Sequence, residues 1–149
     1  MAKTTELREV ELFVREQLRK DYQGHTFTEK ALRLRRKKDG SYSFHKFDAV
    51  SEDNTIVASI KCHSWLTSGG NLPAGKIGQI YQSLYLLSLV DAETKLLILT
   101  DRETYEGFLR VSDGKVAEGI LIRFYPLSSE LQRLLKNMHK KASQEMYHE

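Results

Sequence analysis

Cysteine is nearly absent from this chain, and its scarcity bears on both fold and compartment. The 149 residues include a single cysteine, Cys62, so no internal disulfide can form. Disulfide bonds are rare in the reducing cytosol, and a chain without them is typical of that compartment. The first residues also lack the apolar core of a secretory signal peptide. We therefore expect a cytoplasmic protein.

Long apolar runs and prolines are also scarce. No uninterrupted apolar run approaches the roughly 20 residues that span a bilayer, so we expect no membrane partner. Neither of the two prolines falls between residues 26 and 63, where the pattern favours strands. Charged residues make up 29% and hydrophobic residues 40% of the chain, as in ordinary globular proteins. The length fits one folding unit, and we predict a single domain over residues 1–149.

Hydrophobic periodicity predicts the order helix, three strands, helix, strand, helix, strand, helix. The predicted helices cover about residues 6–20, 75–90, 101–109 and the region from 129 onward, and the predicted strands cover 26–37, 42–50, 55–63, 95–100 and 119–125. The Asp39-Gly40 pair indicates a hairpin turn, so the first three strands should form an antiparallel meander. Strands that then alternate with helices predict an α/β fold with a central mixed sheet and helices on both faces.

The most informative stretch joins the second and third predicted strands. Successive side chains of a strand point to opposite faces, so Ser59, Lys61 and His63 should share the face opposite Ile56, Ala58, Ile60 and Cys62. Asp48, on the preceding strand, is placed to meet Lys61 on that polar face. A carboxylate beside a lysine suits metal-assisted phosphodiester cleavage. The simpler interpretation is a cross-strand ion pair.

With this element order, and with Asp48 and Lys61 at these positions, the chain resembles the PD-(D/E)XK nuclease superfamily, which has the restriction-endonuclease-like fold. The resemblance extends from the first helix to the strand at Gly119. It implies a DNA endonuclease that depends on Mg²⁺ or Mn²⁺, with Asp48 as metal ligand and Lys61 positioning the attacking water. Some members add a glutamate from the first helix, and here Glu11 falls at the edge of the apolar stripe. Glu11 is otherwise a boundary residue whose carboxylate reaches water. Cutting both strands of a duplex usually takes two sites, which makes a homodimer plausible.

The chain departs from the pattern of this superfamily at two positions. Ser59 stands where the second acid is expected, and Phe47 stands where proline is expected. The following helix has no acid between residues 73 and 82. We therefore expect Ser59 and the amide of Gln79 to complete the catalytic site. The alternative is a non-catalytic module that kept the nuclease fold and binds nucleic acid or protein.

Basic residues are concentrated in one run, with six within positions 30–38. Such clusters neutralise phosphates and give salt-sensitive binding to nucleic acid. The predicted DNA contacts are Arg33, Arg35, Arg36, Lys37, Lys38 and, at a helix N-terminus that favours phosphate, Lys76. The competing interpretation of the run is a strand edge kept soluble by its charge.

Three weaker signals lie around residues 63–76. The segment from Gly70 to Lys76 has the glycine and lysine spacing of a phosphate-binding P-loop, but Ile77 replaces the Ser or Thr that would bind Mg²⁺. Trp65 is a candidate for base stacking, and His63 for a metal ligand or general acid. A loop anchor and a surface histidine are the simpler interpretations of these two residues.

Overall fold

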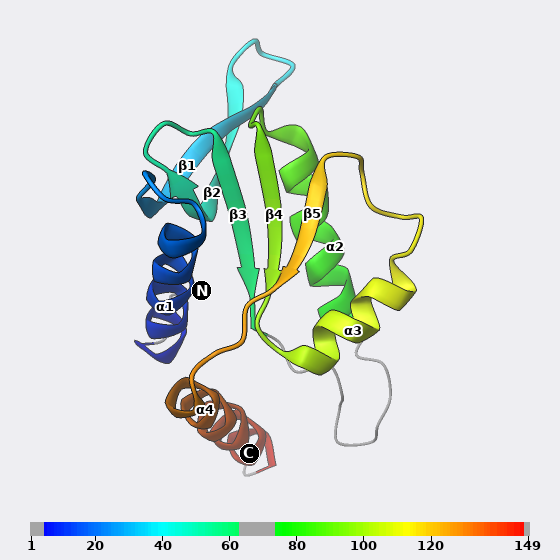
Figure 1. Cartoon of the computed structure of the whole chain (residues 1–149). Coiled ribbons are helices and arrows are strands. Elements are labelled where there is room, and N and C mark those ends of the chain that lie inside the picture. The colour runs from blue at the N-terminus through cyan, green and yellow to red at the C-terminus, as the bar shows by residue number, and fades with distance from the viewer. Residues whose placement is uncertain (1–4, 63–73, 148–149) are drawn as a thin grey trace.

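A five-stranded mixed sheet forms the centre of the molecule (Figure 1). The computed structural model describes residues 5–62 and 74–147, with side chains as far as Met138. The elements are α1 (Thr5–Asp21), β1 (Phe27–Arg36), β2 (Tyr42–Ser51), β3 (Ile56–Lys61), α2 (Ala74–Leu89), β4 (Thr94–Leu99), α3 (Arg102–Val111), β5 (Ile120–Phe124) and α4 (Ser129–Tyr147). Their order is the predicted one, which confirms this part of the sequence analysis.

The strands lie in the order β1-β2-β3-β4-β5. The first three pair antiparallel, and β3, β4 and β5 pair parallel. Antiparallel neighbours need only tight turns, and here Gly40 and Asn54 adopt the positive φ values of 89° and 64° that such turns require. Parallel neighbours need a crossover, which α2 and α3 supply. The predicted mixed α/β class is thus confirmed.

Helices cover both faces of the sheet, as predicted. One face, called the α2 face below, is covered by α2 and α3, and the opposite face, called the α1 face, by α1 and α4 (Figure 1). The α2 face includes the sheet residues Phe47, Val50, Val57, Leu97 and Leu99. The α1 face includes Ala49, Ile56, Ala58, Ile60 and Ile98. Within the residues that the structure describes, none of the helices combines the length and hydropathy of a membrane span.

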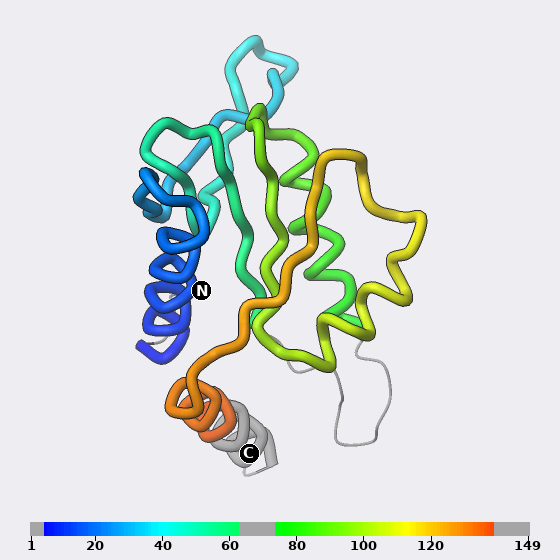
Figure 2. The backbone as a smooth tube through the Cα atoms, viewed as in Figure 1, coloured from blue at the N-terminus to red at the C-terminus, as the bar shows by residue number. Residues whose placement is uncertain are grey.

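Strands β2 and β3 diverge near Asp48. Strand β1 pairs with β2 from Phe27 opposite Ser51 to Arg36 opposite Tyr42, whereas β2 and β3 pair at Ala49–Ala58 and Val50–Val57. Residues 30–48, called the arm below, therefore form a two-stranded ribbon that extends past the rest of the sheet (Figure 2).

A β-bulge sits at the base of the arm. The register shifts between Thr28 and Lys30, so that Asp48 and Ala49 both lie opposite Glu29. An extra residue interrupts the alternation of side chains along the bulged strand. Phe47 and Val50 accordingly both pack on the α2 face, which leaves Asp48 and Ala49 together on the α1 face.

Candidate functional site

Three carboxylates converge at the base of the arm. Glu11 of α1, Glu29 of β1 and Asp48 of β2 each offer an oxygen, and these oxygens lie within 4.8 Å of one another. Glu11 is only 8% exposed, so it is not a boundary residue reaching water. A buried carboxylate needs compensating partners, and hard oxygen donors are the ligands that Mg²⁺ and Mn²⁺ prefer. The donor set therefore fits a divalent cation.

Asp48 is held in place from both sides. Its Oδ2 accepts a 2.7 Å hydrogen bond from the backbone N–H of Ile60, and its backbone carbonyl accepts a 2.8 Å bond from Nε of Arg15. The first bond gives the Ile60 N–H an acceptor where β2 leaves β3, and the second ties α1 to β2. These two bonds hold both the carboxylate and the backbone of Asp48 in place.

Two cations lie beside these carboxylates. The guanidinium of Arg15 is 3.5 Å from Oε2 of Glu11, and Nζ of Lys46 is 3.2 Å from Oε1 of Glu29. These contacts reduce the mutual repulsion of the acids, so the cluster is also compatible with a purely structural ion-pair network.

Ser59 and Lys61 lie on the other face of the sheet. Strand β3 pairs with β4 in regular register, which places Ser59 beside Leu97 and Lys61 beside Leu99. Both leucines belong to the α2 face, and Ser59 is buried there. The structure thus brings Asp48 and Glu11 together, and it places Lys61 on the face opposite these carboxylates.

The charges of Asp48 and Lys61 both act on the pKa of His45. Burial lowers the pKa of His45, while the charge of Asp48 raises it and the charge of Lys61 lowers it. The His45 ring packs edge-on against Phe47 with ring centroids 4.8 Å apart, which places it on the α2 face. The His45 ring therefore shares the face of Ser59 and Lys61.

The same charges act on Cys62. Burial raises the pKa of the Cys62 thiol to about 11, the charges of Glu11 and Asp48 raise it further, and that of Lys61 opposes them. The raised pKa keeps the thiol protonated at neutral pH.

The other predicted residues lie outside the carboxylate group. Gln79 is exposed on α2, and Lys76 is half-buried in the first turn of that helix. The predicted DNA contacts on the arm are exposed, namely Arg33, Arg35, Arg36, Lys37 and Lys38. The predictions for His63, Trp65 and the loop before Ala74 fall outside the described residues.

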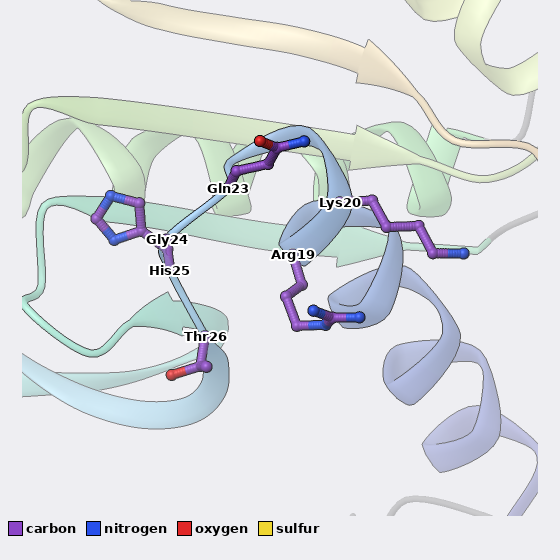
Figure 3. Close-up of a pocket in the computed structure, with 6 residues that line it drawn as sticks. All are labelled: Arg19, Lys20, Gln23, Gly24, His25 and Thr26. Atoms are coloured by element: carbon purple, nitrogen blue, oxygen red, sulfur yellow. The ribbon is translucent and has the colours of Figure 1, made fainter.

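A second acidic group lies at the far end of α1. Nδ1 of His25 is 3.1 Å from Glu52 and 3.7 Å from Asp53, next to a hollow of about 560 Å³ lined by Arg19, Lys20, Gln23, Gly24, His25 and Thr26 (Figure 3). Hydrogen bonds from the side chains of Thr55 and Ser51 lower the pKa of Asp53 to about 2. Asp53 uses these bonds to hold the turn between β2 and β3, and its group is more exposed than the group at Glu11.

Glu29 and His45 were not predicted as site residues. Glu29 follows the buried Phe27 by two residues, so the two side chains are expected on the same face, which is the α1 face. Only the strand register places Glu29 opposite Asp48. His45 has no neighbour in sequence that suggests a site, and its position depends on the same register.

Comparison with protein-family models, curated proteins and solved structures gives no match to this chain. Membership of the PD-(D/E)XK superfamily is therefore a proposal that rests on element order and on the residues described above.

Proposed function

We propose that this chain is a nuclease-like domain that hydrolyses DNA phosphodiester bonds with a divalent cation, Mg²⁺ or Mn²⁺. The observation that carries the proposal is the convergence of Glu11, Glu29 and Asp48 where β2 and β3 diverge. A bound cation would supply an activated water and neutralise charge on the phosphate oxygens.

The protein groups around the carboxylates have separate tasks in this proposal. Arg15 and the Ile60 N–H hold Asp48 rigidly, so that the ligand oxygens are arranged before any ion arrives. Lys46 and Arg15 limit the repulsion between the acids. The basic arm attracts the phosphate backbone.

The roles of Lys61, Ser59 and Gln79 come only from the resemblance. Lys61 would position the attacking water, with Ser59 and Gln79 completing the site. A cytoplasmic location and a homodimer that cuts both strands belong to the same proposal.

One observation favours the alternative of a non-catalytic binding module. Lys61 and Ser59 lie on the α2 face, whereas the carboxylates lie on the α1 face. In this case the acids would form a structural ion-pair network and the arm would bind nucleic acid without cleavage.

Metal binding and cleavage should be measured separately. Calorimetric titration with Mn²⁺ should show a site that Glu11→Gln and Asp48→Asn weaken at least about tenfold. The matched control is Glu52→Gln, which alters the exposed group at His25. Wild-type affinity in both ligand variants would contradict the metal site.

Cleavage should then be followed on plasmid and single-stranded DNA with Mg²⁺ or Mn²⁺. The proposal predicts cleavage that Asp48→Asn and Lys61→Ala abolish and Glu52→Gln leaves unchanged. Cleavage that survives Lys61→Ala would remove the lysine role taken from the resemblance. No cleavage with either metal, together with retained DNA binding, would establish the binding module instead.

A further inference from the structure

The arm carries an aromatic and cationic surface on the same face as the carboxylates. A second bulge inserts one extra residue of β1 between the pairs Arg33–Phe44 and Arg36–Tyr42. Opposed residues of antiparallel strands share a face, so Arg33, Arg36, Tyr42 and Phe44 all lie on one side. We call these four residues the arm platform.

Contacts within the platform confirm this arrangement. The guanidinium carbons of Arg33 and Arg36 lie 4.4 Å and 5.3 Å from the centroid of the Tyr42 ring. Arg36 also donates a 3.0 Å hydrogen bond to the Tyr42 hydroxyl. Two cations are thus oriented by one aromatic ring, while their side chains stay exposed.

Phe44 adds an exposed aromatic ring to the platform. Its side chain is 63% exposed, although it sits in the middle of a strand pair. Arg33 lies opposite Phe44 in the strand pair, so the exposed ring has a guanidinium-bearing residue beside it. An exposed aromatic ring next to arginine side chains suits a ligand that offers both a flat base and a phosphate.

The platform leads directly to the carboxylates. Phe44, Lys46 and Asp48 alternate along β2 on one face, and Lys46 pairs with Glu29 of the carboxylate group. The four residue steps from Phe44 to Asp48 span about 13 Å along the strand.

We propose that the arm platform binds single-stranded DNA, with a base stacked on Phe44 and flanking phosphates on Arg33 and Arg36, and directs the strand toward Glu29 and Asp48. This inference names the substrate form of the proposed nuclease and rests on that function. Single strands are favoured over duplex because the bases of a duplex are already stacked on one another.

Binding should be measured by fluorescence anisotropy with a labelled oligothymidylate of about 12 nucleotides in EDTA, so that no cleavage occurs. Phe44→Ala should weaken binding about tenfold, in line with loss of one stacked base. The double variant Arg33→Gln with Arg36→Gln should reduce the salt dependence of binding by about two phosphate contacts. All of these side chains are exposed, and circular dichroism checks that the variants fold.

Two matched controls lie elsewhere on the surface. Tyr85 on α2 is 64% exposed, and Arg110 on α3 is exposed. Tyr85→Ala and Arg110→Gln should leave binding unchanged. Equal losses in Phe44→Ala and Tyr85→Ala, or no loss in Phe44→Ala, would overturn the platform. Tighter binding of duplex DNA, or of an RNA of equal length, would overturn the single-stranded DNA assignment.

The two proposals fail in different ways. Platform-dependent binding without cleavage in Mg²⁺ or Mn²⁺ would keep the platform and overturn the hydrolytic function. Metal-dependent cleavage that Phe44→Ala leaves intact, with unchanged binding, would keep the nuclease and overturn the platform.

Discussion

Oδ2 of Asp48 accepts a 2.7 Å hydrogen bond from the backbone N–H of Ile60 at the point where β2 separates from β3. A side chain here takes the position that a strand carbonyl holds elsewhere in an antiparallel ladder. Asp48, which we propose as a metal ligand, thus also completes the sheet.

This double role predicts different effects for two substitutions of Asp48. Asp48→Ala removes the acceptor of the Ile60 N–H and should lower the free energy of unfolding by about 1–3 kcal/mol. Asp48→Asn keeps a carbonyl oxygen and should unfold near the wild-type urea concentration, while losing the ligand charge. Equal destabilisation in both variants would show that the hydrogen bond is not the source of the effect.

Cys62 should react slowly with alkylating agents. Its pKa rises from 9.0 to about 11, mainly through burial, so the thiolate fraction near pH 8 falls about a hundredfold. Iodoacetamide labelling followed by mass spectrometry should be at least that much slower in the folded protein than in urea. Glu11→Gln removes a charge that raises this pKa and should speed the labelling, whereas a rate no faster than wild type would contradict the effect of the Glu11 charge on the thiol.

Asp53 should contribute to stability in a pH-dependent way. Hydrogen bonds from Thr55 and Ser51 hold its pKa at about 2, below the ordinary value of 3.8. A carboxyl group whose pKa is lowered by folding contributes its full stabilisation at pH values above its pKa in the unfolded chain. This stabilisation is lost as the pH falls through about 2, the pKa in the folded protein. The difference in melting temperature between wild type and Asp53→Ala should therefore be largest above pH 5 and shrink toward pH 2.

The control for Asp53 is Asp91→Ala, which alters an exposed aspartate after α2. It should leave the melting temperature nearly unchanged at every pH, as is usual for surface sites. A difference for Asp53→Ala that stays constant from pH 7 to pH 2 would contradict the lowered pKa.

Asp101 should stabilise α3 as its N-cap. Its carboxylate accepts hydrogen bonds of 3.0 Å from the Thr104 N–H and 2.7 Å from the Thr104 hydroxyl. Asp101→Ala should lower the free energy of unfolding by about 1 kcal/mol, and Asp101→Asn by much less. Urea denaturation measures both, with Glu103→Ala in the exposed first turn as control. A larger loss in the control would exclude the cap as the cause.

Local patterns determined much of the fold. Periodicity and turn residues predicted the element order because each element is set by its own apolar stripe or alternation. The alternation of β3 was also predicted correctly, since Ile56, Ala58 and Ile60 all pack on one face. Ser59 and Lys61 therefore lie on the opposite face, as their sequence positions indicate.

The composition of the site was decided only by the tertiary structure. Plain alternation from Ala49 would place Asp48 on the face of Ser59 and Lys61, but the bulge opposite Glu29 turns Asp48 onto the α1 face. One extra residue in a ladder depends on how two strands pair, and no pattern within either strand encodes it. For the same reason the sequence did not predict that Glu29 lies beside Asp48. The register of the two strands, and not the distance along the chain, determines which residues lie opposite each other.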